Sequence, residues 1–89
     1  MNELELNSNV DSKVVCIVYI NEINIVIMAL LCGYLIGFDI ETKSVLWRIK
    51  LSDSIMCMIN HKDIESNKVY CGLSNGKLAI LEVIIFLKY

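Results

Sequence analysis

Residues Val69–Glu82, VYCGLSNGKLAILE, are the stretch that decides the fold of this chain. Two apolar runs, Val69 to Leu73 and Leu78 to Leu81, are rich in residues that favour strands. Between them lies Asn75-Gly76, a dipeptide typical of hairpin turns, because Asn tolerates a positive φ and Gly adopts one without steric cost. The stretch therefore predicts two short strands joined by a tight turn of type I′.

An earlier stretch, Val26–Asp39, repeats this pattern at an offset of 43 residues without a gap. The matching positions are Val69 on Val26, Leu73 on Leu30, Gly76 on Gly33, Leu78 on Leu35, Leu81 on Phe38 and Glu82 on Asp39. Ahead of these stretches, Ile55–Ile59 matches Val14–Val18 at an offset of 41. A repeat of this length with four strands in each unit is the size of one blade of a β-propeller. The period therefore predicts propeller blades.

Outside the repeats, the clearest strand pattern is Ser44–Leu51, where Val45, Trp47, Ile49 and Leu51 lie on one face and Ser44, Leu46, Arg48 and Lys50 on the other. A period of two predicts a strand with one covered face, and Trp47 is expected to be its large core residue. The remaining strands are expected at Val14–Tyr19, Ile23–Leu31, Tyr34–Ile40, Ile55–Ile59, Val69–Leu73 and Leu78–Leu81. A polar loop is expected at Asn60–Asn67.

This order of strands predicts an all-β fold, a fragment of a β-propeller with about one and three-quarters four-stranded blades. Residues 1–13 are polar and read as a tail or linker. The first blade is expected at 14–53 and the second, incomplete blade at 54–89. The end of the chain departs from the repeat after Glu82, which favours a piece of a larger propeller over an intact domain.

Composition excludes some classes of function. The net charge is −2 and no basic stripe is present, so we expect no binding to nucleic acid. The apolar fraction of 56% is high, and Ile23–Phe38 contains no charged residue. A membrane span needs ~20 residues. This segment is shorter, and its repeat partner contains Asn75 and Lys77, which argues against a membrane span. A membrane-associated polypeptide that uses 23–38 therefore stays an alternative rather than the main interpretation.

The cysteines at positions 16, 32, 57 and 71 lie inside apolar runs rather than in loops. Met1–Val10 is polar and acidic, unlike a signal peptide. We therefore interpret the cysteines as reduced thiols of the core in a cytoplasmic protein. Their spacing matches no zinc module, so no metal site is expected.

Candidate chemistry is sparse. His61 with Asp63 could begin an acid–base pair, but a lone histidine in a polar loop is more often exposed to solvent. Ser52 and Ser54 lack the G-x-S-x-G context of a serine nucleophile, and no glycine-rich phosphate loop occurs. We expect no catalytic, cofactor-binding or metal-binding residue and no cofactor.

Asp39 and Glu82 occupy matching positions of the repeat. They could line a binding face as a pair of carboxylates. We favour the structural interpretation, in which each acid caps the turn that follows it.

The stretch Gly33–Trp47, GYLIGFDIETKSVLW, resembles a blade of WD-repeat and quinoprotein-like propellers, in which a strand ending in Asp precedes a Thr-containing turn and a Trp-bearing strand. More particularly, Ile49–Leu81 resembles the C-terminal propeller of the JNK-interacting scaffold proteins. It is also similar to propellers of Rho guanine-nucleotide exchange factors and of ROCO-type leucine-rich-repeat kinases. In such proteins the segments directed at kinases, motors or GTPases lie outside this region, so the resemblance assigns no functional residue.

The resemblance implies a non-catalytic protein-interaction module within a cytoplasmic scaffold or signalling protein. Its partners would be proteins, including kinase-cassette or motor components reached through the parent scaffold. A propeller piece from an exchange factor or a ROCO-type kinase is the alternative of the same class. A piece of a quinoprotein-like enzyme is weaker, because no cofactor ligands are visible.

Overall fold

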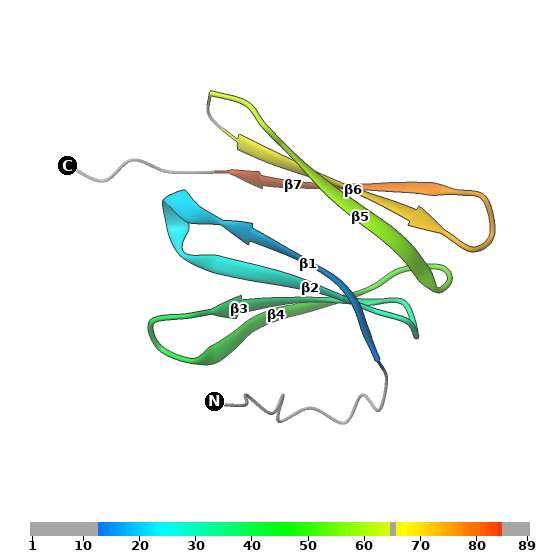
Figure 1. Ribbon diagram of the computed structural model, residues 1–89, viewed down its shortest axis with the longest axis horizontal. Helices are drawn as coiled ribbons and strands as arrows, with labels where there is room; N and C mark the ends of the chain where they lie inside the picture. The colour runs from blue at the N-terminus through cyan, green and yellow to red at the C-terminus, as the bar shows by residue number, and fades with distance from the viewer. Residues whose placement is uncertain (1–12, 65, 85–89) are drawn as a thin grey trace.

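In the computed structural model the chain forms two antiparallel β-sheets, and the structure describes residues 13–64 and 66–84. The first sheet contains β1 (Val14–Ile20), β2 (Ile25–Leu30), β3 (Tyr34–Asp39) and β4 (Ser44–Lys50) in that order. The second contains β5 (Ile55–Lys62), β6 (Ser66–Leu73) and β7 (Leu78–Ile84). A single 3₁₀ turn, η1 (Asn21–Ile23), links β1 to β2. Figure 1 shows the two sheets as stacked layers.

These sheets confirm the all-β prediction and the propeller-like order of strands, four followed by three. The blade ranges 14–53 and 54–89 each enclose one sheet, and the tail expected at 1–13 lies almost wholly outside the described residues. The alternation expected in Ser44–Leu51 is also present. Ser44, Leu46, Arg48 and Lys50 are exposed, while Val45, Trp47 and Ile49 are half-buried.

The hairpin at Asn75-Gly76 forms as expected, but its turn is not of type I′. The amide of Gly76 donates to the carbonyl of Leu73 over 3.1 Å, and Gly76 has φ 84°. Among the described residues other than glycine, only Asn24 and Lys43 have positive φ, so Asn75 lies outside the left-handed region. This is the three-residue loop in which an ordinary turn is followed by a left-handed glycine. Three loop residues, rather than two, remove the need for positive φ at Asn75.

The repeat seen in the sequence is reproduced in the pairing of the strands. Cys16 pairs with Ala29 in the first sheet, and Cys57 pairs with Gly72 in the second. Both sheets have a shift of register at the same place, between Val14 and Cys16 and between Ile55 and Cys57. The β2–β3 turn also matches the β6–β7 turn, since Gly33 donates to Leu30 over 2.9 Å and has φ 102°. The offsets of 41 and 43 residues are therefore structural equivalences.

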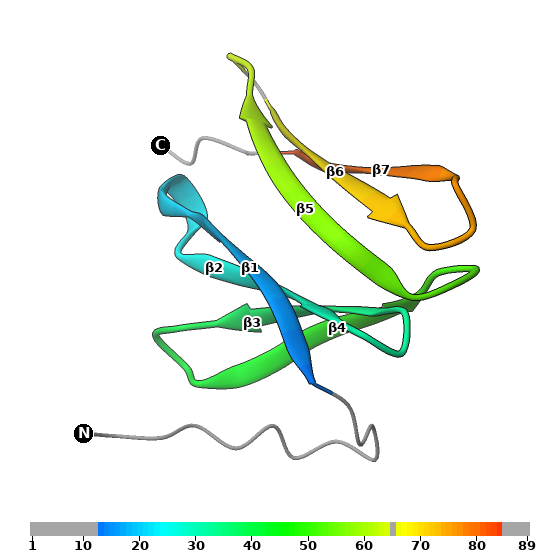
Figure 2. The same cartoon turned by 45° about the vertical axis from the view of Figure 1, so that its right-hand side comes forward.

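The core lies between the two sheets. Buried side chains of the first sheet (Ile20, Ile27, Ala29 and Leu35) meet those of the second (Ile55, Met58, Val69, Cys71 and Leu73). Trp47 of β4 packs at the margin of this cluster, in agreement with its expected role. Between the sheets, β1 is in contact with β5, and the two strands lie side by side in Figure 2.

One expectation about a connection is wrong. The loop expected at Asn60–Asn67 is shorter, because β5 continues to Lys62 and β6 begins at Ser66. Polar side chains do not prevent pairing, and His61 lies opposite Lys68 in the ladder. The strands expected at Ile23–Leu31 and Tyr34–Ile40 are present as β2 and β3, and they contain most of the uncharged segment 23–38. Within the described ranges, no helix is both long and apolar enough to cross a membrane.

Candidate protein-interaction surface

Three connections gather at one end of the two sheets, which we call the polar end: Asn21–Asn24, Ile40–Lys43 and the turn that begins at Asp63. Asn24 adopts φ 57° and ψ 43° at the end of η1, a conformation that Asn tolerates because its short side chain hydrogen-bonds locally. The hydroxyl of Tyr19 donates to Oδ1 of Asn24 over 2.7 Å. Nδ2 of Asn24 donates in turn to Oε1 of Glu41 over 3.2 Å. Asn24 therefore ties the β1–β2 link to the β3–β4 loop.

The β3–β4 loop is also fixed from within. Oδ1 of Asp39 accepts hydrogen bonds from the amides of Glu41, over 2.9 Å, and Thr42, over 3.3 Å. Asp39 is thus the turn-capping acid expected from the sequence. Glu82 is not its counterpart, because it lies within β7 opposite Lys68 rather than at a turn.

An ion pair joins the two sheets at the polar end. Nζ of Lys62, on β5, contacts Oε1 of Glu22, in η1. The hydrogen bond from Lys62 is the largest of the causes that hold the pKa of Glu22 below its usual value. Because the partners belong to different sheets, the pair links one hairpin of each sheet to the other.

His61 and Asp63 lie near each other at the polar end, with Nε2 of His61 3.7 Å from Oδ1 of Asp63. Both side chains are exposed, and His61 belongs to β5 rather than to a loop. An exposed pair at this distance has no desolvated site around it that would favour acid–base catalysis. Within the described ranges, no three His, Cys, Asp or Glu side chains are grouped as a metal site would require.

The opposite end of the sheets contains the two serines considered as nucleophiles. Oγ of Ser52 accepts a hydrogen bond from Nδ2 of Asn75 over 3.2 Å. The amide of Ser54 donates to Oδ1 of Asp53 over 2.7 Å, which is the largest of the causes that lower the pKa of Asp53. The structure brings no histidine to these serines. The amide of Ser74 also donates to the carbonyl of Ser54 over 3.0 Å, so this bond and the bond between Ser52 and Asn75 connect the β4–β5 link to the β6–β7 turn.

The cysteines do not share one environment, so the expectation that all of them lie in the core is only partly right. Cys71 is buried. Burial is the largest cause that raises the pKa of its thiol, and the nearby thiols of Cys16 and Cys57 raise this pKa further. The thiol of Cys16, half-buried, donates to the carbonyl oxygen of Met58 over 3.5 Å. Cys57, its repeat equivalent, is exposed on the outside of the second sheet.

The sequence interpretation missed the residues that organise the polar end, Tyr19, Asn24 and Glu41. Asn24 carried a readable signal, since an Asn between an apolar strand and a short turn is a common left-handed residue. The partners of Asn24 have no such signal in the sequence, because their contacts depend on the pairing of three strands.

Comparison with known proteins agrees with this architecture. The family model described as LRRK2 beta propeller matches residues 1–88. No curated protein and no solved structure matches the chain significantly. The expected propeller is thereby confirmed, while the resemblance to JNK-interacting scaffold proteins gains no support. The chain belongs to the LRRK2 beta propeller family.

Proposed function

We propose that this chain is a non-catalytic protein-interaction module, and that the polar end is the surface that its protein partner contacts. The match to a propeller family over residues 1–88 carries the proposal, since blades act as a frame that presents loops and edges. The ordered connections of the polar end support this location for the interface. Asn24, Asp39 and the Glu22–Lys62 pair hold its connections in place before any partner binds.

A surface that is ordered in advance loses little conformational entropy on binding, which favours affinity. Tyr19 adds a large, half-exposed ring whose hydroxyl is already hydrogen-bonded to Asn24. Tyrosines in such positions are frequent centres of binding energy in protein interfaces. The mixture of Glu22, Glu41, Lys43 and Lys62 around it supports a polar rim rather than a strongly charged one.

Amine-reactive crosslinking in cells, followed by mass spectrometry, tests the location. Lys43 at the polar end and Lys77 at the opposite end are both exposed and provide a matched pair of native probes. We expect crosslinks to a partner from Lys43 and not from Lys77. The purified partner should then bind the chain, with weaker binding to Lys43→Glu and unchanged binding to Lys77→Glu. Equal loss with both variants would show that the polar end is not the interface.

We further propose that the parent is a signalling protein of the ROCO-type kinase class, located in the cytoplasm. The family match supports the class. Sequencing the full transcript across both ends of this reading frame tests the parent. Further in-frame repeats next to a GTPase and kinase region are the expected result. A different neighbouring domain would refute the ROCO-type assignment without affecting the crosslinking test.

A further inference from the structure

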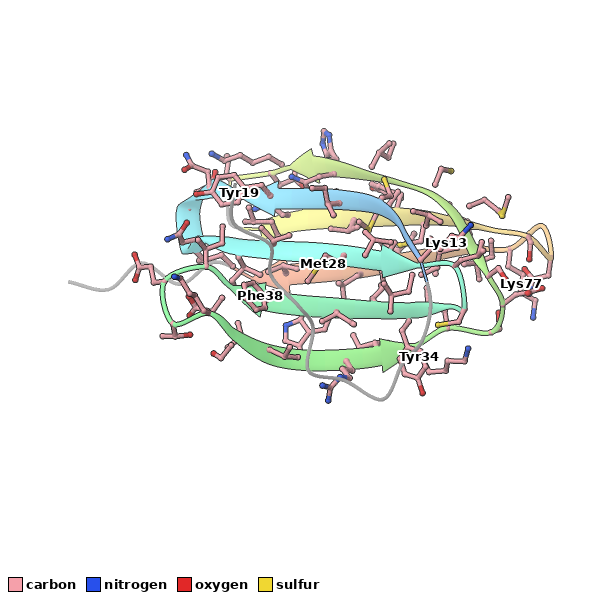
Figure 3. The ribbon with its side chains drawn as sticks, turned by 60° about the horizontal axis from the view of Figure 1, so that its bottom comes forward. Lys13, Tyr19, Met28, Tyr34, Phe38 and Lys77 are labelled. Carbon is pink, nitrogen blue, oxygen red and sulfur yellow. The ribbon has the colours of Figure 1, made fainter. Side chains whose placement is uncertain are left out.

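Asn75 and Gly76 form the only Asn-Gly pair of the sequence, and both residues are exposed in the β6–β7 turn. Figure 3 shows Lys77, the next residue, at the end of the sheets opposite Tyr19. Gly76 has no β-carbon, and apart from Gly76 and its two chain neighbours no residue has an atom within 4 Å of the place where one would lie. Neither a side chain of its own nor a distant residue therefore obstructs approach to the backbone of Gly76.

Asparagine is a thermolabile residue, and the following glycine permits the reaction responsible. The backbone nitrogen of Gly76, after losing its proton, can attack Cγ of Asn75, because these two atoms close a five-membered ring. A bond forms between this nitrogen and Cγ, the bond from Cγ to Nδ2 breaks, and Nδ2 leaves as ammonia. Water then opens the succinimide ring and leaves either an aspartate or an isoaspartate. The overall change consumes a water molecule, releases ammonia and transfers no electrons.

Three hydrogen bonds restrain the reacting groups. Oδ1 of Asn75 accepts a hydrogen bond from the amide of Lys77 over 3.0 Å. Nδ2 of Asn75 donates to Oγ of Ser52 over 3.2 Å. The amide of Gly76 donates to the carbonyl of Leu73 over 3.1 Å. The first two bonds fix the side-chain amide, and the third engages the proton that the nitrogen of Gly76 must lose. The turn therefore contains both the reactive pair and its restraint.

The bond to Ser52 distinguishes this turn from an isolated hairpin. Ser52 lies in the β4–β5 link, which joins the two sheets, and Asn75 lies 23 residues further along the chain. The amide of Ser74 donates to the carbonyl of Ser54 in the same link over 3.0 Å. These two contacts hold the β6–β7 turn against the link. The restraint on Asn75 therefore depends on a contact between segments that are distant in sequence.

We propose that Asn75 is a site of spontaneous deamidation, and that its hydrogen bond to Ser52 slows the reaction. The reaction removes its own restraint, because neither product has the amide group that donates to Ser52. In the isoaspartate the main chain also passes through Cβ and Cγ of residue 75, which adds a backbone atom to a tight loop. Deamidation should therefore release the β6–β7 turn from the β4–β5 link and weaken the hairpin as the chain ages.

Incubation of the full 89-residue chain at pH 8, sampled over days, tests the reaction. Peptide mass spectrometry, with retention standards for the aspartyl and isoaspartyl forms, measures the loss of the amide at each asparagine. Asn60 is also exposed but precedes His61, so it is the native comparison in the same sample. Because only glycine lacks a β-carbon beside the attacking nitrogen, Asn75 should react at least ~10-fold faster than Asn60. Asn75→Gln should not react, because its side chain would have to close a larger ring.

Ser52→Ala tests the restraint. Loss of this hydrogen bond should raise the rate at Asn75 about 3-fold in the folded chain, and Ser52→Thr, which keeps a hydroxyl, should react like the parent. Ser44→Ala is the control, because it removes an exposed hydroxyl at the polar end, and it should leave the rate unchanged. In urea all of these variants should react equally fast, since the contact at residue 52 is absent from an unfolded chain.

Two results would overturn the proposal. An Asn75 that keeps its amide throughout the incubation would show that the turn is not a reactive site. An equal rate in Ser52→Ala and the parent would show that the β4–β5 link does not slow the reaction. The predicted weakening has its own measurement, the urea midpoint of aged and fresh chains. Ageing should lower the midpoint of the parent and leave that of Asn75→Gln unchanged, and a lowered midpoint in both would assign the loss to another position.

Discussion

The indole ring of Trp47 occupies the space beside Gly37, so that a β-carbon on Gly37 would lie 2.3 Å from Cε2 of Trp47. The two residues are directly paired between β3 and β4. The glycine thus makes room for the one tryptophan of the chain to pack at the margin of the core.

Gly37→Ala should therefore destabilise the fold by about 1–3 kcal/mol, the usual cost of overpacking. In a strand without this contact, the same change would stabilise by roughly 0.5–1 kcal/mol because alanine is less flexible than glycine. Urea unfolding followed by circular dichroism measures the difference. Trp47→Leu should remove most of the penalty, so the double variant is more stable than the sum of the two single effects predicts. Simple additivity would mean that the ring and the glycine are not in conflict.

Gly76→Val should destabilise the β6–β7 hairpin through its backbone alone. Gly76 has φ 84°, and apart from Gly76 and its two chain neighbours no residue has an atom within 4 Å of the position that a β-carbon would take. A left-handed conformation costs an L-residue about 1–2 kcal/mol, and we expect a loss of this size in urea unfolding and a lower soluble yield. Gly76→Asn should lose less, because Asn tolerates this region. An unchanged midpoint for Gly76→Val would show that the turn is not as described.

Comparison with the equivalent turn of the first sheet separates the cost of a positive φ from the cost of a steric clash. Gly33 also has positive φ, but a β-carbon there would lie 2.7 Å from the carbonyl oxygen of Asp53. Gly33→Ala should therefore cost more stability than Gly76→Ala, although the two turns have the same hydrogen bond and match in the repeat. The comparison is made by thermal unfolding of both variants. Equal losses would mean that the β4–β5 link moves away from Gly33 without cost.

The thiols of Cys57 and Cys71 should differ in reactivity. Cys57 is exposed, whereas burial raises the pKa of Cys71, so less of its reactive thiolate is present at any given pH. At pH 8 we expect iodoacetamide to modify Cys57 at least ~10-fold faster than Cys71, whose reaction also requires local opening of the sheet contact. Peptide mass spectrometry over a time course measures both rates in one sample. Adding urea should remove the difference.

The sequence was sufficient for features that depend on neighbours along the chain. The pattern of Val69–Glu82 predicted the hairpin, because strand-forming runs around Asn-Gly act locally. The turn type was missed, since loops of two and three residues contain the same dipeptide. The length of the loop at Asn60–Asn67 was overestimated, because its polar composition was interpreted as a break between two strands. An antiparallel ladder with one exposed side accepts polar residues such as His61.

Burial could not be predicted in the same way. Cys16 and Cys57 match in the repeat, yet one is half-buried and the other exposed. The difference arises because the second sheet packs against that face of the first, whereas among the described residues no strand packs against the corresponding face of the second. Which face is covered is decided by contacts between residues that are distant in sequence, and periodicity identifies a face without identifying its neighbour. The network around Asn24 was hidden for the same reason.

The Glu22–Lys62 pair should make stability depend on pH in a defined direction. The hydrogen bond from Lys62 lowers the pKa of Glu22 in the folded chain below the usual value of a glutamate. A lowered carboxyl pKa gives stability that is present above the unfolded value and is lost as the pH falls through the folded value. Glu22→Gln should therefore be less stable than the parent at pH 7, and the two should converge as the pH falls below about 4. Urea midpoints across this range measure the difference.

Lys62→Gln should behave in the same way and should add nothing to Glu22→Gln, because either change removes the same pair. A difference from the parent that persists at pH 3 would assign the effect of Glu22→Gln to packing of η1 rather than to the charge that links the two sheets.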